Sequence, residues 1–231
     1  MRRGFALAAC VLMAAGACGP RSEPTPPAPQ RPPAAQPPNR AASRPRIVAL
    51  GDSLTAGLGL AQSDAYPSRL QTLVDAEGLN YEVVNGGVSG DTSAGGLSRL
   101  DWALDGDVRF LIVALGGNDA LRALPPGQLR QNLATIVERA QARHITVVLA
   151  GMEAPRNFGR DYDVRFHQVY PDLAQKYNVA LVPFLLQDVA GIDRLNQRDG
   201  IHPTAEGAVI VANNIWTVLK PLVGAHGAGR S

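Results

Sequence analysis

Short apolar runs alternate with stretches of helical periodicity between residues 46 and 222, and this alternation limits the chain to one class of fold. The runs Phe110–Leu115 and Ile145–Ala150 are continuously apolar, as strands covered on both faces are. The apolar runs predict strands at 46–50, 81–85, 108–115, 144–150 and 179–183. Helices are predicted from near Ala65, from near Thr92, and over 126–143, 162–176 and 204–219. Such alternation predicts an α/β fold whose five-stranded parallel sheet is joined by right-handed crossovers.

The N-terminus has the features of an export signal. Arg2 and Arg3 precede the apolar stretch 4–17, which is shorter than the roughly 18 residues of a membrane-spanning helix. The small residues before Cys18 permit lipidation of that cysteine after cleavage, or cleavage followed by simple secretion. We expect 1–18 to be a lipoprotein signal, with Cys18 as the lipidated residue. The protein is then a periplasmic, membrane-anchored lipoprotein of a bacterial cell envelope, and secretion is the alternative.

The segment 19–45 differs in composition from the rest of the chain. It holds ten of the 18 prolines and no aromatic residue, so it cannot bury enough surface to order itself. We predict a disordered, proline-rich tether there, a single domain over 46–222 and a flexible tail over 223–231. Cleavage before Cys18 leaves a chain with one cysteine and no internal disulfide.

Charge argues against a nucleic-acid partner. From residue 46 onward there are 16 basic and 19 acidic side chains, a net charge of −3. Nucleic-acid binding needs a concentrated basic face, which this balance does not favour.

Four polar clusters follow predicted strands or stand in loops beside them. They are Gly51-Asp52-Ser53-Leu54, Ser89-Gly90-Asp91, Gly116-Gly117-Asn118-Asp119 and Asp199-Gly200-Ile201-His202-Pro203. The carboxyl ends of parallel strands share one edge of a sheet, where ligands of open α/β folds bind. The clusters therefore predict one site.

Ser53 is the candidate nucleophile of this site, acting on an ester. A serine hydroxyl needs a base, and the base needs an orienting partner. Of the four histidines, His202 is the one expected in a loop at the same edge, and Asp199 precedes it by three residues. That spacing can bring the carboxylate to Nδ1 and leave Nε2 free to take the serine proton. A plainer interpretation stays open, in which Asp52 and Ser53 cap a helix and Asp199 begins a turn.

An acyl transfer also needs hydrogen-bond donors for the oxyanion that forms. The candidates are the N–H groups of Ser53 and Gly90 and the side-chain amide of Asn118. The plainer alternatives are a turn that leads into a capped helix at 89–92, and a glycine turn with Asn118 in the left-handed region.

These clusters resemble the four sequence blocks of the SGNH (GDSL-type) hydrolases. The segments 84–93, 154–162 and 170–174 are similar to the bacterial subgroup of arylesterases, thioesterases and lysophospholipases. The resemblance covers roughly 46–222, with the blocks in the right order.

The resemblance implies a three-layer α/β/α flavodoxin-like fold and a triad of Ser53, His202 and Asp199. It also implies an oxyanion hole made by Ser53, Gly90 and Asn118. No metal and no cofactor are implied. The substrates it implies are acyl esters, acyl thioesters and lysophospholipids.

A substrate loop is expected over Met152 and the segment Arg156-Asn157-Phe158. Relatives often have proline or alanine at the position of Arg156 and tyrosine at that of Phe158, so substrate preference is expected to differ. Leu58, Leu121 and Met152 are candidates for an acyl-binding surface.

Three other functions fit parts of the pattern. A carbohydrate O-acetyl esterase would use the same machinery, but no cluster of aromatic residues for stacking on sugars is evident. A non-catalytic envelope lipoprotein would keep the fold as a binding module. A nucleotide-binding protein is disfavoured, because Gln62 stands where the third glycine after Gly57 and Gly59 would be, and no phosphate-binding loop is present.

Overall fold

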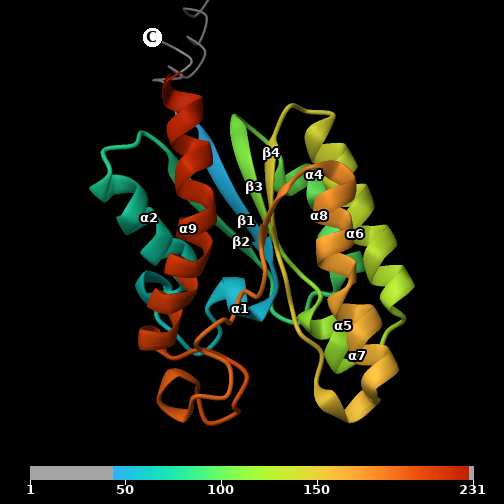
Figure 1. Cartoon of the computed structure of the whole chain (residues 1–231). Coiled ribbons are helices and arrows are strands. Elements are labelled where there is room, and N and C mark those ends of the chain that lie inside the picture. Colours follow the sequence, from blue (N-terminus) through green and yellow to red (C-terminus); the bar gives the residue numbers. More distant parts are fainter. Residues whose placement is uncertain (1–43, 229–231) are drawn as a thin grey trace, which may run out of the picture. The chain divides into compact units, whose positions relative to one another are not determined.

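The computed structural model describes residues 44–228, which form three layers with a parallel sheet between two layers of helices (Figure 1). The strands are β1 (Arg46–Gly51), β2 (Glu82–Gly87), β3 (Val108–Ala114), β4 (Thr146–Ala150) and β5 (Ala180–Val182). Their order is β2-β1-β3-β4-β5, with all neighbours parallel. The three-layer α/β fold class is thereby confirmed. Cys18, the expected signal and the expected tether up to residue 43 lie outside the described residues. The last two residues of the expected tether are described, and Arg44 pairs there with Asp75 at 3.4 Å.

Helices cover both faces of the sheet (Figure 1). One face is covered by α2 (Tyr66–Ala76) and α9 (Ala205–Ala228). The other carries α4 (Leu100–Ala103), α5 (Gly117–Leu121), α6 (Pro126–Gln141), α7 (Arg160–His167) and α8 (Val169–Tyr177). The remaining helical segments are α1 (Ser53–Ala56), α3 (Ser93–Ser98) and the 3₁₀ turns η1 (Gln62–Asp64), η2 (Arg156–Phe158) and η3 (Asp193–Leu195).

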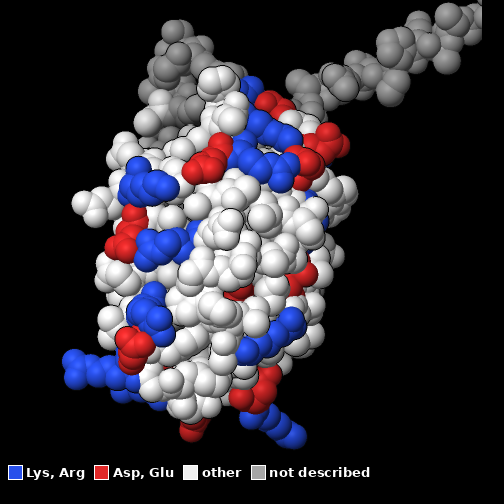
Figure 2. All heavy atoms as spheres, turned by 90° about the vertical axis from the view of Figure 1, so that its right-hand side faces the viewer, with Lys and Arg blue, Asp and Glu red and all other residues white. Residues whose placement is uncertain are grey.

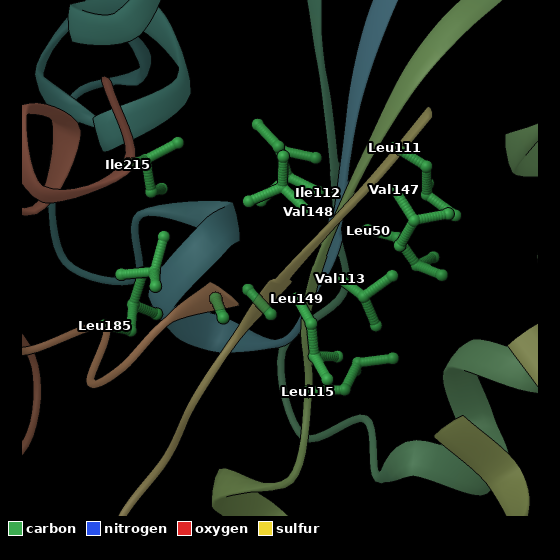
Figure 3. Close-up of a cluster of buried hydrophobic side chains, with 14 of the residues drawn as sticks. Leu50, Leu111, Ile112, Val113, Leu115, Val147, Val148, Leu149, Leu185 and Ile215 are labelled. Carbon is green, nitrogen blue, oxygen red and sulfur yellow. The ribbon is translucent and has the colours of Figure 1, made fainter. Parts of the chain in front are cut away.

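The core lies on both sides of β3 and β4, because side chains alternate between the faces of a strand. Figure 3 shows Leu111 and Val113 on one side of the sheet, and Ile112 and Val148 on the side of Ile215 from α9. All five are almost fully buried. The continuous apolar runs of the sequence therefore become the two central strands, as predicted.

The order of the strands determines where a site can form. The chain leaves β1, passes through α2 on one face, and returns in β2 beside β1. It then passes through α3 and α4 to β3, on the other side of β1. Successive connections therefore diverge between β1 and β3, and the crevice beyond their carboxyl ends is where such sheets bind ligands.

One predicted helix, 162–176, proves to be two. The first, α7, ends at His167, and α8 begins at Val169. Pro171 explains the break, because a proline ring clashes with the carbonyl four residues earlier, which here is that of His167. The proline is tolerated in the first turn of a new helix.

The C-terminal helix is longer than the sequence predicts. Helix α9 continues to Ala228, although a helix over 204–219 and a tail from 223 were expected. Leu219 and Val223 are buried on the same face, and this packing holds the helix in place past Pro221. Its length and hydropathy would suffice to cross a membrane, but Val211, Ile215 and Leu219 pack in the core.

Basic side chains stand next to acidic ones on the face formed by α6 and α8 (Figure 2). Arg130 of α6 pairs with Asp172 of α8 at 2.7 Å. Near the amino end of the sheet, Arg139 and Arg143 both pair with Asp101, at 2.5 and 2.6 Å. Uncharged side chains form a broad area between these groups (Figure 2).

Candidate active site

Ser53 is the first residue of α1 and stands directly beyond the carboxyl end of β1. Gly51 makes this tight turn possible, because a Cβ there would lie 1.9 Å from Thr55 Oγ1 and 2.8 Å from the carbonyl oxygen of Ala114. Asp52 Oδ1 accepts the N–H of Leu54 at 3.0 Å and so caps α1. The helix-cap interpretation of Asp52 is therefore correct, and the cap itself fixes the position of the Ser53 hydroxyl.

His202 reaches Ser53 from a loop 149 residues further along the chain. Its Nε2 lies 2.8 Å from Ser53 Oγ, and its Nδ1 lies 2.7 Å from Asp199 Oδ2. Asp199 Oδ1 also accepts the N–H groups of Ile201 and His202, at 2.9 and 3.0 Å. The turn that could have been merely structural thus aims the carboxylate at the imidazole.

The hydrogen bonds to Asp199 also determine its charge. The N–H groups of Ile201 and His202, and then the His202 ring, lower the pKa of Asp199 to about 2. A carboxylate that accepts several N–H groups is stabilised in its ionised form. Asp199 is therefore an anion at neutral pH, and a negative partner keeps a proton on Nδ1 of His202.

Two of the three predicted oxyanion donors are free. In the segment 44–228, the N–H groups of Ser53 and Gly90 make no hydrogen bond. Gly90 has φ +86°, a left-handed conformation that side chains disfavour, and its carbonyl accepts Arg122 Nη2 at 2.9 Å. Both N–H groups are therefore available to a ligand.

Asn118, the third predicted donor, is already engaged. Its Nδ2 donates to the carbonyl of Asp91 at 2.9 Å and to Asp52 Oδ2 at the longer distance of 3.3 Å. It lies in α5, which follows Gly116. Gly116 has φ +120°, and a Cβ there would lie 2.1 Å from Tyr170 Oη, so only glycine fits at this position. A substrate oxygen would have to replace one of the two bonds of the amide.

Sequence reasoning missed Asp52 as a charged group of the site. It is 2% exposed, and burial raises its pKa to about 6 against the hydrogen bonds from Leu54 and Asn118, which lower it. The signal was present in the sequence, since an acidic residue between a glycine and the candidate nucleophile has to lie close to that nucleophile. Asp52 and Asn118 together join β1 to α5.

A buried polar network behind the site was also missed. Asp119 accepts the N–H and the hydroxyl of Ser93, at 2.7 and 2.6 Å, and Asn132 donates to that hydroxyl at 2.9 Å. Asp119 and Ser93 are 1% and 0% exposed. The network ties α5 to α3 and α6, and so fixes the residue that follows Asn118.

A groove of about 350 Å³ opens beside Ser53 and His202. Its lining is mainly apolar: Leu54, Leu121, Met152, Phe184, Leu186 and Ile201 contribute to it. Of the residues expected to bind an acyl chain, Leu121 and Met152 line the groove, whereas Leu58 lines a much smaller pocket beside Ser53. The groove can hold an aliphatic chain.

The expected substrate loop lines the groove only in part. Met152 to Pro155 contribute to the lining, but Arg156, Asn157 and Phe158 lie beyond it in η2 and are exposed. The Phe158 ring packs edge-on against Tyr162, with centroids 5.6 Å apart. In the described part of the chain, no group of three or more His, Cys, Asp or Glu side chains could hold a metal ion.

The chain is similar in sequence and in fold to several known proteins. The model of the GDSL-like Lipase/Acylhydrolase family matches residues 49–210. Esterase TesA of Pseudomonas aeruginosa is 43% identical over 178 residues, which cover 77% of this chain and 89% of that protein. Thioesterase 1/protease 1/lysophospholipase L1 of Escherichia coli is 38% identical over 185 residues, which cover 80% and 88%. The crystal structure of AlinE4, an SGNH-hydrolase family esterase, is 43% identical with a TM-score of 0.66, and the match covers 79% and 96%.

Proposed function

The chain belongs to the GDSL-like lipase/acylhydrolase family and is a carboxylic ester hydrolase, and we propose that Ser53, His202 and Asp199 are its catalytic triad. The observation that carries the assignment is the pair of contacts at His202. They are 2.8 Å from Nε2 to Ser53 Oγ and 2.7 Å from Nδ1 to Asp199 Oδ2. A nucleophile, a base and an orienting carboxylate in contact have the geometry of acyl transfer through a covalent intermediate.

The reaction follows from these contacts. Ser53 Oγ attacks the carbonyl carbon while His202 Nε2 takes its proton, and the ionised Asp199 stabilises the imidazolium. The imidazolium then protonates the leaving alcohol or thiol, and an acyl-serine remains. Water loses a proton to the same nitrogen and attacks the acyl carbon, which releases the acid and restores the Ser53 hydroxyl.

The oxyanion of each tetrahedral intermediate lies between the N–H groups of Ser53 and Gly90. Both groups are free of other partners in the described residues. Asn118 supplies the third donor when its amide exchanges the 3.3 Å contact with Asp52 for the substrate oxygen. The remaining 2.9 Å bond to Asp91 keeps the amide in place. Removal of one such donor lowers kcat by about 10²–10³-fold.

The substrate class follows from the groove and from the relatives. An apolar groove of about 350 Å³ beside the nucleophile fits an aliphatic acyl chain. Two relatives are named as an esterase and as a thioesterase/lysophospholipase. We infer that this enzyme cleaves aryl esters, acyl thioesters and lysophospholipids.

Two rival functions are less well supported. A carbohydrate O-acetyl esterase would need a polar, aromatic cleft, whereas the groove is mainly apolar and Phe184 is the aromatic residue in its lining. Acetylated xylan compared with p-nitrophenyl acyl esters of increasing chain length separates the two activities. A non-catalytic envelope lipoprotein would not turn over any of these esters.

We also propose that the enzyme acts in the bacterial cell envelope, anchored through a lipid on Cys18. The basic residues at the N-terminus, the apolar stretch and the small residues before Cys18 support this proposal. The wild type should fractionate with membranes and Cys18→Ala should not. A Cys18→Ala variant that stays with membranes would rule out the anchor.

Labelling tests the identity of the nucleophile. A fluorophosphonate probe should modify the wild type at Ser53, identified by mass spectrometry of the labelled peptide. Ser53→Ala should lose both labelling and turnover while keeping its thermal unfolding transition. Ser68→Ala is the matched control, because this exposed hydroxyl donates to the Gln62 carbonyl in another part of the fold. Turnover that survives in folded Ser53→Ala would refute the assignment.

A further inference from the structure

Arg99 is the most highly connected cation beside the site, and the proposed chemistry does not use it. It stands between α3 and α4, with a side chain that is 16% exposed. Its Nε donates to Asp91 Oδ2 at 2.6 Å, its Nη1 to the carbonyl of Gly86 at 2.7 Å, and its Nη2 to the carbonyl of Gly51 at 2.8 Å. One guanidinium thus contacts three chain segments.

Each of the three contacts leads to the site. Gly51 ends β1, two residues before Ser53. Asp91 follows Gly90, and its carbonyl accepts the amide of Asn118. Gly86 lies near the end of β2, and the connection from β2 carries Gly90. Gly90 and Asn118 are therefore linked to Arg99 through Asp91, and Ser53 is linked to it through Gly51 and Asp52.

The local backbone leaves room for this arrangement. Gly95 faces the Asp91 carboxylate, and a Cβ at Gly95 would lie 2.7 Å from Asp91 Oδ1. A Cβ at Gly87 would lie 2.2 Å from the backbone nitrogen of Ala56, so β2 can approach α1 closely only with glycine there. Arg99 thus joins segments that pack too closely for a side chain at Gly87 or Gly95.

The chemistry of the contacts requires arginine. Two carbonyls and a carboxylate in different directions need three donors held in one plane, which a guanidinium provides and an ammonium does not. The 2.6 Å contact with Asp91 is a charge-assisted hydrogen bond between side chains that are 16% and 19% exposed. Such a contact restrains the loop more than an exposed ion pair would.

We propose that Arg99 is a positioning residue that sets the oxyanion hole, acting through Asp91 and the carbonyls of Gly51 and Gly86. It does not touch the substrate. It holds the N–H groups of Ser53 and Gly90 and the amide of Asn118 at the spacing that a tetrahedral oxyanion needs. The proposal rests on the proposed function, since it assumes that these three donors form the oxyanion hole.

Kinetics of two variants test the proposal. Arg99→Ala should lower kcat about 10²-fold, with KM on a p-nitrophenyl ester nearly unchanged, because a displacement of about 1 Å costs about that much. Arg99→Lys should recover only part of the loss, because it restores the charge and not the planar geometry. If Arg99→Ala does not fold, Arg99→Lys and Asp91→Asn carry the test, with an expected loss of about tenfold in kcat each.

A second readout separates positioning from general destabilisation. An alkyl trifluoromethyl ketone adds to the serine and forms an oxyanion, whereas the matching methyl ketone binds without one. The Arg99 variants should weaken the trifluoromethyl ketone by the same factor as kcat and leave the methyl ketone unchanged. Equal weakening of both ketones, or an unchanged kcat in folded variants, would overturn the proposal.

Arg46 provides the matched control. It also joins β1 to β2, through Glu82 Oε2 at 3.0 Å, but at the amino ends of the strands. Arg46→Ala should keep kcat and both ketone affinities. Turnover by folded Ser53→Ala would refute the proposed function itself, whatever the Arg99 variants show. Arg99 variants with full kcat beside an inactive Ser53→Ala would refute only the positioning role.

Discussion

The two ends of the sheet are held by different kinds of contact. At the carboxyl ends of the strands, Asp52, Ser93 and Asp119 are nearly inaccessible to solvent, and each is hydrogen-bonded. At the amino ends, Arg46 pairs with Glu82 and both side chains are about 40% exposed. Buried polar groups must keep every partner, whereas exposed ion pairs contribute little.

The difference shows that the positions of the polar side chains are fixed more strictly at the carboxyl end of the sheet than at the amino end. Leaving a buried donor or acceptor unpaired is costly, so a network at the carboxyl end has one favourable arrangement. The exposed pairs at the amino end can be lost or replaced with small effect. Changes at the carboxyl end should therefore alter kcat, and changes at the amino end should alter stability slightly or not at all.

The largest effect is expected from Asp199→Asn. The amide would still accept the N–H groups of Ile201 and His202, but it would place a donor against Nδ1 of His202. The imidazole would then carry its proton on Nε2 and could not take one from Ser53. We expect kcat to fall about 10⁴-fold, the size of the loss from the same change in a comparable triad.

Steady-state kinetics with p-nitrophenyl butyrate measure this effect. Asp101→Asn is the control, because Asp101 is also an exposed aspartate with short contacts, made to Arg139 and Arg143 near the amino end. Its kcat should equal that of the wild type. A loss of less than tenfold in Asp199→Asn would show that the carboxylate does not set the tautomer.

The second effect concerns Asn118. Asn118→Ala should lower kcat by about 10²–10³ with little change in KM, because the amide is needed in the transition state and not in the ground state. Asn178→Gly is the control near the amino end of β5, where Asn178 caps α8 with φ +50° and glycine fits the same conformation. A rise in KM without a fall in kcat would mean that Asn118 binds the ground state.

Much of this arrangement can be predicted from the sequence. The pattern of apolar residues predicts the strands, and the common edge of parallel strands predicts where their following loops meet. The continuous apolar runs identify β3 and β4, and the carboxyl ends of parallel strands share an edge, so Ser53 and His202 were expected to meet there. The break in the helix at 162–176 was missed although Pro171 specifies it. Helical periodicity alone does not show the break, because the apolar positions keep the same spacing on both sides of Pro171. A proline does not always end a helix, since α9 continues past Pro221.

The remaining features leave little trace in the sequence. Two of the three partners of Arg99 are backbone carbonyls, and a backbone acceptor has no residue type by which to recognise it. The engagement of Asn118 by Asp91 likewise involves a carbonyl. The raised pKa of Asp52 results from burial at a junction of three elements, which only the packed fold creates.

The third effect is a dependence of stability on pH. Burial raises the pKa of Asp52 from 3.8 to about 6, so the folded protein keeps a proton that the unfolded chain has released. This group favours folding below about pH 4, and its contribution is lost as the pH rises through about 6. The change is about 3 kcal/mol in the free energy of unfolding.

Urea unfolding of the wild type and Asp52→Asn between pH 4 and 7 measures this change. The wild type should lose about 2 kcal/mol relative to the variant over that range, because part of the full change is already complete at pH 4. Asp101 changes the free energy of unfolding in the opposite direction. The hydrogen bond from Arg139 lowers the pKa of Asp101, so its contribution to stability is lost as the pH falls. Parallel curves for the wild type and Asp52→Asn would contradict the buried carboxylate.

The smallest effect is expected from Glu82→Gln at the amino end. Its carboxylate accepts Arg46 Nε at 3.0 Å, but both side chains are about 40% exposed, and such surface pairs contribute about 0.2–1 kcal/mol. The free energy of unfolding should fall by that amount at low salt and by less in 1 M NaCl, because salt screens exposed charges. The value of kcat should not change at either salt concentration. A loss above about 2 kcal/mol, or any fall in kcat, would mean that the two ends of the sheet are coupled, and the contrast between them would no longer hold.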